Sequence, residues 1–334
     1  MVSCSKFNRQ IDPTLNTPHS TKNETHDTLD KFLDEYGFQV NPNITSEQKY
    51  ELLQLLYTYR DVFARTLSEI KQYPHFELEL DLLSNKKHFK RQYKLHPNDE
   101  DIAEKQIQEM LDIGVLEDAP SSQYNSPIFL VGKKDGTKRF VVDLRGINSL
   151  IAPKLIQLPN LEYLIHQVTS AQPKFMNVCD LRSGFWQVKL QKQSRDLTTF
   201  TSPSSGRRYR FTVAPFGLST SPYGMLYILT SIFANKSTAS QIYVYMDDVL
   251  TTGVTWEQNL QNLTTVLEIL RKNSLTCNPS KCAFAQTDIE YLGFRISGDG
   301  VRVSERKIKL IKQLAPPTNK KISPTTDWFI HILA

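Results

Sequence analysis

Hydrophobic residues recur at helical spacing in some stretches of the 334-residue chain and at alternating positions in others. Residues 1–44 are polar, rich in Thr, Asn, Asp and Ser, and almost without apolar periodicity, which predicts a flexible leader. At Thr45 the pattern changes. Thr45-x-x-Gln48 forms a capping box, and the leucines that follow at near-helical spacing predict an amphipathic helix to about Ala64. The stretch before Gly114 has apolar residues on one helical face and predicts a second helix. Gly114 would end this helix by adopting the left-handed conformation.

Runs of β-branched and aromatic residues predict strands at 127–131, 140–142, 174–181, 185–190, 242–246 and 249–252. The first two runs flank Asp135-Gly136 and predict a hairpin with a basic tip. The last two predict a hairpin whose turn carries Asp247 and Asp248.

Three more apolar patterns predict helices in the second half of the chain. Residues 224–234 are apolar on several sides, and Thr255-x-x-Gln258 caps a helix with leucines spaced three, four and three apart. A last helix is expected over about residues 304–314. Because the strands lie in hairpins and not in regular βαβ repeats, we expect an α+β fold built on antiparallel sheet.

Composition narrows the class of protein. Hydrophobic residues make up 40% and charged residues 22%, which is typical of a globular protein and unlike a disordered or membrane protein. No apolar run reaches the roughly 20 residues that cross a bilayer, so no membrane partner is expected. The N-terminus lacks a secretory signal, and Cys4, Cys179, Cys277 and Cys282 form no paired CxxC clusters. We therefore expect an intracellular protein with reduced thiols, and neither a zinc site nor a disulfide framework.

The net charge of +5 says little about partners, but its distribution is uneven. Two stretches gather basic residues: Lys86, Lys87, Lys90, Arg91 and Lys94, and then Arg302, Arg306, Lys307, Lys309 and Lys312. Such patches suit a polyanion, and they equally suit a solvated surface that favours solubility. The residues alone leave both interpretations open.

Asp247 and Asp248 interrupt an apolar strand, where adjacent carboxylates repel each other and resist desolvation unless a cation neutralises them. Asp180 ends another apolar strand and offers a third carboxylate if the two strand ends lie side by side. Mg²⁺ prefers such oxygen ligands, and two ions about 4 Å apart support nucleotidyl transfer. Loop-capping acids remain the alternative.

Six motifs in sequence order carry a resemblance to a known family. They are residues 139–145 (RFVVDLR), 180–187 (DLRSGFWQ), 214–218 with 221–222 (APFGL, SP), 245–248 (YMDD), 278–282 (NPSKC) and 291–294 (YLGF). Over about residues 73–318 the chain resembles reverse transcriptases of gypsy-type (Metaviridae-like) long-terminal-repeat retrotransposons.

The resemblance implies a right-hand polymerase fold, with fingers, a palm whose antiparallel sheet carries the YxDD hairpin, and a partial thumb. The implied divisions are a leader (1–44), an N-terminal helical segment (45–72), fingers (73–158 and 194–212), palm (159–193 and 213–296) and partial thumb (297–334). After residue 319 the sequence departs from the family pattern, and we expect a frameshift, a misannotated intron or a truncated copy as the cause.

The resemblance also assigns roles to single residues. Asp180, Asp247 and Asp248, with the backbone carbonyl of Leu181, are the expected ligands of two Mg²⁺ ions, which Mn²⁺ can replace. Lys133 and Arg139 are expected to bind the triphosphate, and Phe216 and Gly217 to line the nucleotide pocket. Phe185 matches the steric gate against ribonucleotides, with an ordinary core aromatic as the alternative. Lys281 is a candidate general acid, and Leu292 and Gly293 match the turn that holds the primer end.

The implied activity is RNA-directed DNA synthesis, with an RNA or DNA template, a primer strand and dNTPs as partners. A relic or nucleic-acid-binding module without turnover is the first alternative. A primase or RNA-dependent RNA polymerase is disfavoured by Phe185, because a small polar residue is expected there. The resemblance places the protein in the cytoplasm, a virus-like particle or the nucleus, and it leaves the oligomeric state undetermined.

Overall fold

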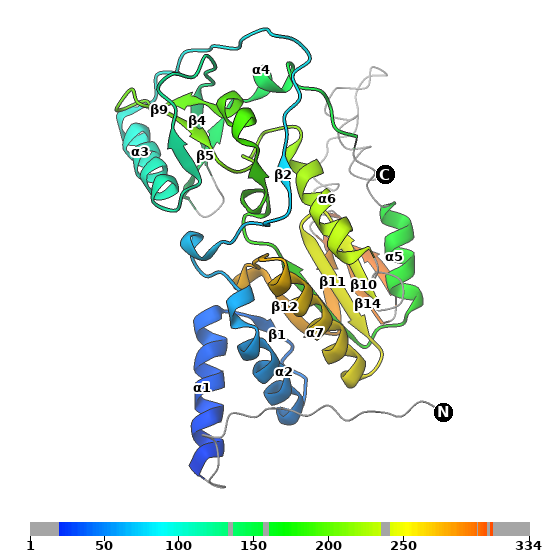
Figure 1. Ribbon diagram of the computed structural model, residues 1–334. Helices are drawn as coiled ribbons and strands as arrows, with labels where there is room; N and C mark the ends of the chain where they lie inside the picture. The colour runs from blue at the N-terminus through cyan, green and yellow to red at the C-terminus, as the bar shows by residue number, and fades with distance from the viewer. Residues whose placement is uncertain are drawn as a thin grey trace.

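The computed structural model describes residues 20–132, 136–155, 160–234, 241–298, 300–305 and 308–309, with the side chains of residues 20–25 left out. An upper lobe and a lower lobe are joined by a few extended segments, and two N-terminal helices lie beneath the lower lobe (Figure 1). Helices and antiparallel sheets are mixed throughout, so the predicted α+β class is confirmed.

A five-stranded sheet forms the centre of the lower lobe, in the order β1-β12-β6-β11-β10. Its strands are β1 (Gln39–Val40), β12 (Ala283–Gln286), β6 (Phe175–Asp180), β11 (Asp248–Gly253) and β10 (Ile242–Tyr245). Neighbours pair antiparallel, except that β1 runs parallel to β12. The predicted strands at 174–181 and 242–252 are therefore confirmed to within a residue or two.

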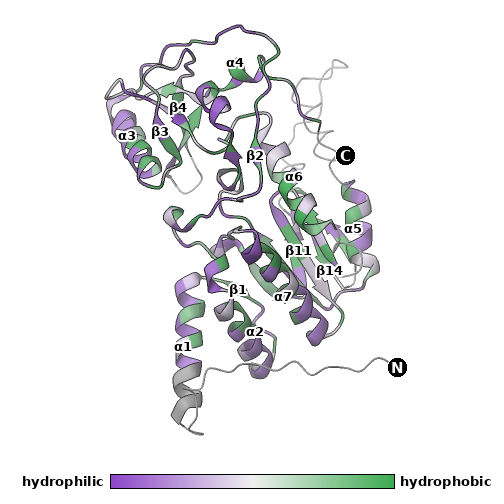
Figure 2. Cartoon of the chain, viewed as in Figure 1, coloured by the Kyte–Doolittle hydropathy of each residue, from purple (hydrophilic) through white to green (hydrophobic). Residues whose placement is uncertain are grey.

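Both faces of this sheet are covered. Helices α6 (Ser221–Phe233) and α7 (Trp256–Lys272) pack on one face, and α7 buries Leu263, Val266, Leu267 and Leu270 there. Figure 2 shows hydrophobic positions gathered where β11, α6 and α7 meet. The other face packs against α5 (Leu161–Ser170) and a second sheet of β13 (Asp288–Tyr291), β14 (Phe294–Ser297) and β15 (Gly300–Val303). Because alternate residues of a strand point to opposite faces, Cys179 joins one core and Met176 the other.

The predicted flexible leader is wrong for residues 20–44, and residues 1–19 lie outside the described part. Helix α1 (Ser20–Tyr36) packs on α2 (Ser46–Thr58), and β1 extends the central sheet. The apolar residues are few, but Leu29, Phe32 and Phe38 are buried, and the Phe38 ring lies 5.5 Å from that of Phe284. Phe284 lies 246 positions after Phe38, so local periodicity did not reveal this contact.

At the start of α2 the predicted capping box is confirmed, because Thr45 Oγ1 accepts from Gln48 N and Gln48 Oε1 accepts from Thr45 N. The helix ends at Thr58, earlier than predicted. The chain continues through short 3₁₀ turns at η1 (Arg60–Val62) and η2 (Leu67–Glu69).

The upper lobe combines helices α3 (Pro97–Asp112) and α4 (Arg145–Asn148) with a small sheet and a hairpin. The sheet contains β3 (Leu116–Asp118), β9 (Arg208–Phe211) and β8 (Phe200–Thr201), and the hairpin contains β4 (Ile128–Gly132) and β5 (Lys138–Val142). The hairpin prediction is confirmed, with Gly136 at φ +79° in its turn, whereas Lys133 lies outside the described residues. As predicted, Gly114 follows α3 with φ +72°.

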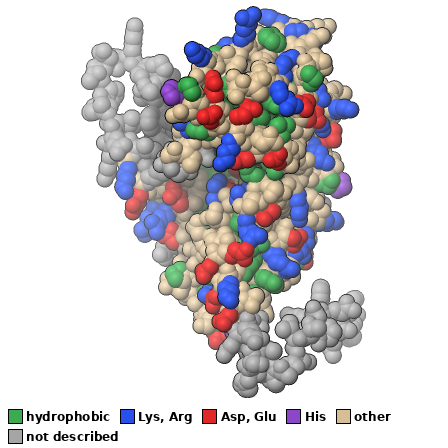
Figure 3. All heavy atoms as spheres, turned by 90° about the vertical axis from the view of Figure 1, so that its left-hand side faces the viewer, with side chains coloured by type: hydrophobic (Ala, Val, Ile, Leu, Met, Phe, Trp, Pro, Cys, Tyr) green, Lys and Arg blue, Asp and Glu red, His purple; other side chains and the backbone are tan. Residues whose placement is uncertain are grey.

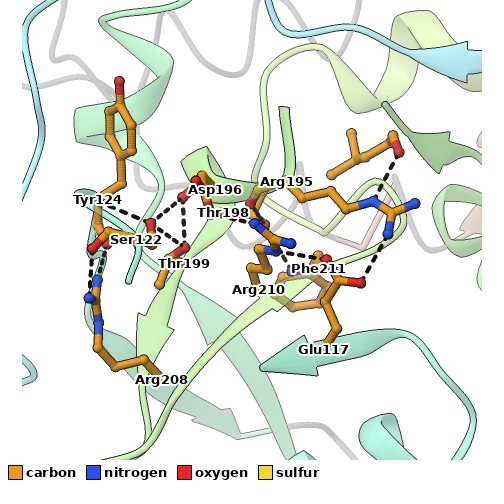
Figure 4. A network of polar contacts seen from close by, with 11 residues as sticks. Glu117, Ser122, Tyr124, Arg195, Asp196, Thr198, Thr199, Arg208, Arg210 and Phe211 are labelled. Atoms are coloured by element: carbon orange, nitrogen blue, oxygen red, sulfur yellow. Dashed lines mark hydrogen bonds and ion pairs between the residues drawn. The ribbon is translucent and has the colours of Figure 1, made fainter. Parts of the chain in front are cut away.

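Charged side chains hold the upper sheet to the segment before it (Figure 4). Glu117 accepts from Arg195 at 3.0 Å and from Arg210 at 2.7 Å, and Arg210 also donates to Asp196 at 2.6 Å. These half-buried arginines are therefore neutralised within the lobe.

The connections between the lobes contain β2 (Glu77–Leu78), η3 (Gly184–Gln187) and β7 (Lys189–Leu190). The turn η4 (Lys192–Thr198) follows in the upper lobe, and η5 (Pro279–Lys281) lies between α7 and β12 in the lower lobe. The predicted strand at 185–190 is thus largely wrong, since only residues 189–190 are extended. Gln187 explains the difference. Its buried amide donates to Arg182 O at 2.9 Å and Thr276 O at 2.8 Å, and accepts from Thr276 N at 2.8 Å, which favours a compact turn. The helix predicted at 304–314 lies mostly outside the described residues.

Candidate active site

The three predicted carboxylates lie where β6 ends and β11 begins. Asp180 and Asp248 are direct partners in the antiparallel register, and Asp248 also pairs with Tyr245 to close the β10–β11 hairpin. Cβ atoms of such partners lie about 5 Å apart. The hairpin turn is Met246-Asp247, with Met246 at φ +58°, and Asp247 O accepts from Leu181 N at 3.2 Å. The strand register therefore brings together acids that are separated by more than sixty positions.

Asp247 faces a cavity of about 260 Å³ between the lobes. A Cβ added to Gly184 would lie 3.3 Å from Cβ of Asp247, so glycine allows η3 to approach the acidic turn closely. The lining combines residues from η3, β5 and the segment before η5: Leu67, Arg139, Leu181, Arg182, Ser183, Gly184, Phe185, Phe216, Asp247, Asn278 and Lys281.

Burial of the two strand-end acids disfavours their charged forms. It raises the pKa of Asp248 from 3.8 to about 7, and the negative charges of Asp247 and Asp180 add to the rise. Burial likewise raises the pKa of Asp180 to about 6, although the nearby Lys281 ammonium opposes this rise. Unneutralised carboxylates are therefore costly at this position.

One oxygen of Asp180 is well placed for a cation. Oδ2 accepts from Lys281 Nζ at 3.3 Å, whereas Oδ1 is buried and has no hydrogen-bond partner among the described residues. A buried, unpartnered carboxylate oxygen is an oxygen ligand of the kind that hard divalent cations bind, and Asp247 and Asp248 carry two further carboxylates next to it in the sheet. The oxygens of the three carboxylates do not all lie within 4.8 Å of one another in the described structure, so a bound cation would draw them together. The residues thus fit the predicted metal ligands.

Aromatic and basic side chains form the opposite wall of the cavity. The Phe185 and Phe216 rings lie 5.3 Å apart, and the Arg139 guanidinium is 6.0 Å from the centre of the Phe216 ring. Gly217 follows at φ +89°, a conformation that favours glycine. Four predicted pocket residues therefore lie together, on elements that are far apart in the sequence.

Leu292 and Gly293 form the two-residue turn between β13 and β14, with φ +53° and +78°. Positive φ at both positions is typical of a tight hairpin turn. The sheet of β13, β14 and β15 packs on one face of the central sheet. By strand alternation, Asp180 and Asp248 lie on that same face. Lys133 cannot be placed, because it lies outside the described residues.

Several residues support the site without having been assigned a role in the sequence analysis. Asn278 N donates to Asp180 O at 2.8 Å, and Asn278 Oδ1 accepts from Arg182 at 3.2 Å. Asn148 of α4 holds the Phe216-Gly217 segment by donating to Gly217 O and accepting from Ser219 N, both at 2.9 Å. Both asparagines lie within or next to the quoted motifs, but their partners are visible only in the folded chain.

Some of the basic residues in the two predicted patches already have partners within the fold. In the first patch, Lys87 donates to Tyr124 Oη at 3.1 Å, and Lys90 lies 3.6 Å from Asp143. Of the second patch, only Arg302 and Lys309 are described. Figure 3 shows Lys and Arg interspersed with Asp and Glu over one face, so charge alone does not identify a binding surface there.

Within the described part of the chain, no helix is long and apolar enough to cross a bilayer.

Comparison with known proteins agrees with this geometry. Residues 131–296 match the family model described as "Reverse transcriptase (RNA-dependent DNA polymerase)". The chain is 30% identical over 286 residues to the retrovirus-related Pol polyprotein from transposon 412 of Drosophila melanogaster, covering 84% of this chain and 23% of that polyprotein. It is 26% identical over 283 residues to the transposon Tf2-3 polyprotein of Schizosaccharomyces pombe, covering 84% of this chain and 21% of the polyprotein. The chain thus spans about a quarter of the length of these relatives.

Solved structures show the same fold. The foamy viral protease-reverse transcriptase in complex with double-stranded DNA aligns with a TM-score of 0.75 at 23% identity, covering 93% of this chain and 52% of that one. The same viral protein with an RNA/DNA hybrid aligns with a TM-score of 0.72 at 23% identity, covering 92% of this chain and 39% of that one. The predicted right-hand polymerase fold is confirmed.

Proposed function

The chain belongs to the reverse transcriptase (RNA-dependent DNA polymerase) family through residues 131–296, and on that premise we propose that it extends a primer with dNTPs along an RNA or DNA template. The observation that carries this proposal is the pairing of Asp180 with Asp248 next to Asp247, which lines a cavity together with Phe185 and Arg139. The retrotransposon relatives support a gypsy-type origin. We retain the proposed division into fingers (73–158, 194–212), palm (159–193, 213–296) and partial thumb (297–334).

Asp180, Asp247 and Asp248, with the carbonyl oxygen of Leu181, would hold two Mg²⁺ ions, or Mn²⁺ in their place. When bound, these ions would activate the primer 3′-hydroxyl and offset the negative charge of the leaving pyrophosphate. The fit rests on the unpartnered Oδ1 of Asp180 and on the raised pKa values of Asp180 and Asp248, because a cation would remove the cost of burying their charge.

The other lining residues would bind and select the nucleotide. The Arg139 guanidinium would pair with the triphosphate, and Lys133 is proposed for the same role on the family resemblance alone. The Phe185 ring, held against Phe216, would exclude a ribose 2′-hydroxyl. Phe216 and Gly217 would contact the incoming nucleotide.

Two further roles concern the primer and the leaving group. Lys281 lines the cavity, and its 63% exposed side chain places Nζ 3.3 Å from Asp180 Oδ2, so it would donate a proton to the departing pyrophosphate. The Leu292-Gly293 turn would hold the primer end, since its sheet lies on the carboxylate face of the palm. The solved relatives bind double-stranded DNA and an RNA/DNA hybrid, which supports duplex binding by this chain. We place the activity inside the cell, in the cytoplasm, a virus-like particle or the nucleus.

Primer extension on an RNA template with Mg²⁺ and four dNTPs tests the proposal. We expect extension by the wild-type chain and its loss in Asp247→Asn, with primer–template binding retained. Asp118→Asn is the matched control, because Asp118 forms an exposed ion pair with Arg207 in the fingers. If the folded wild-type chain binds primer–template without extending it, the polymerase assignment fails and the binding-module alternative stands.

A further inference from the structure

Three cysteines that are far apart in the sequence meet behind the carboxylates. Cys179 lies on β6, Cys277 follows α7, and Cys282 follows η5. All three are fully buried and unoxidised, and their Sγ atoms lie within 4.8 Å of one another. We call these residues the thiol triad. The spacing of the cysteines along the sequence predicted no zinc site, but the fold brings three of them together.

The thiol triad is connected to the carboxylate site on two sides. Cys179 directly precedes Asp180, and Cys277 and Cys282 flank the loop that carries Lys281. This loop is bound to the end of β6, since Asn278 N donates to Asp180 O at 2.8 Å and Lys281 Nζ lies 3.3 Å from Asp180 Oδ2. Any ligand that draws the three sulfurs together would therefore shift Asp180 and Lys281 relative to each other.

We propose that the thiol triad is a binding site for trivalent arsenic, supplied as arsenous acid. In the balanced reaction, As(OH)₃ and three thiols give As(S-Cys)₃ and three waters. Three As–O bonds and three S–H bonds break, while three As–S bonds and three O–H bonds form. No oxidant or reductant is needed, because arsenic stays trivalent and each thiol proton leaves in a water molecule.

Charge and coordination number favour this ligand over zinc. As(S-Cys)₃ is neutral and needs only three ligands, because a lone pair occupies the fourth position. A zinc ion with three thiolates would carry a net charge of −1 in a fully buried site beside Asp180, and zinc in structural sites is almost always tetrahedral. The cluster of metal-binding side chains in the described part of the chain contains the three sulfurs and no fourth ligand.

Access to the thiol triad would pass through the η5 loop. Ser280 and Lys281 on this loop are exposed, whereas the flanking cysteines are buried. The loop closes on itself through Lys281 N and Cys282 N, which donate to Asn278 O at 3.1 and 3.2 Å. Local opening of a short, exposed loop costs less than global unfolding, although this loop must also release Asn278 N and Lys281 Nζ from Asp180. We therefore expect binding to be slow and its rate to rise in mild denaturant.

Sodium arsenite binding to the full chain carrying Cys4→Ser tests the proposal, because this background leaves only the three thiols. Intact-mass measurement should show one arsenic per chain with the loss of three hydrogens. Thiol titration after unfolding at acidic pH should find no free thiol in the adduct. Cys277→Ala, checked for folding by circular dichroism, should bind about 100-fold or more weakly, because closing the third bond is intramolecular.

Equal arsenite affinity of Cys277→Ala and the parent would overturn the three-thiol site, and so would an adduct that retains one free thiol. If Cys277→Ala does not fold, the mass and thiol count of the parent still decide the question. Binding to urea-unfolded parent as tightly as to the folded chain would also refute a preformed site. None of these measurements involves DNA synthesis, so their failure is distinct from failure of the proposed polymerase activity.

Discussion

The raised pKa of Asp248 predicts that the metal-free site destabilises the folded chain. Asp248→Asn keeps the shape of the side chain and removes its charge. A rise of the pKa from 3.8 to about 7 corresponds to about 4 kcal/mol as an upper limit. Structural relaxation and water reduce this cost. We therefore expect Asp248→Asn to be more stable than the wild type at pH 8, with a free energy of unfolding that is about 1–3 kcal/mol higher.

The sign of the pH dependence follows from the direction of this shift. Because the folded chain holds the Asp248 proton more tightly than the unfolded chain, the stabilising effect of protonation is complete below pH 3.8 and is lost as the pH rises through about 7. The wild type should therefore lose stability between about pH 5 and pH 8 in EDTA, and Asp248→Asn should lose less. The difference in stability between the two proteins should be smaller at pH 5 than at pH 8.

Urea unfolding at pH 5 and pH 8, in EDTA and in Mg²⁺, measures these differences. Mg²⁺ should stabilise the wild type at pH 8 and have a smaller effect on Asp248→Asn, because binding to the folded state shifts the equilibrium. Asp118→Asn, an exposed position on β3, should change stability by less than about 1 kcal/mol. If Asp248→Asn is no more stable than the wild type at pH 8, burial does not penalise the charge of Asp248. A bound cation would then not be needed to offset that charge.

Three further predictions follow from other parts of the molecule. Phe185→Ala should admit ribonucleotides and leave metal-dependent stabilisation unchanged, and unaltered sugar discrimination in single-nucleotide incorporation would remove Phe185 from the proposed gate. Asn148→Ala should raise KM for dNTPs more than it lowers kcat, because the Phe216-Gly217 segment loses two hydrogen bonds, whereas a change in kcat alone would contradict this bracing role. Phe32→Ala should lower the free energy of unfolding by about 3–5 kcal/mol, since the ring is buried, and Asp34→Ala on the exposed side of α1 should have little effect. Equal denaturation curves for these two α1 variants would show that the helix is not part of the cooperative core.

The strands at residues 175–180 and 242–253, the capping box at Thr45 and the acidic hairpin turn could be predicted from the sequence. Each depends on residues within a few positions of one another, because β-branched runs, caps and turns are selected by local sterics and hydrogen bonding. The fold class and the candidate ligands followed from these elements and from motifs whose order resembles a known family.

The tertiary structure alone decided how distant segments meet. The register of β6 against β11 places Asp180 opposite Asp248, and Asn41 reaches Ala285 across 244 positions to fix an N-terminal strand that looked like part of a leader. The compact turn at Gln187 and the thiol triad likewise depend on partners from remote segments. Local patterns carry no information on such pairs, since the free energy that selects them comes from burial and hydrogen bonding in the assembled core.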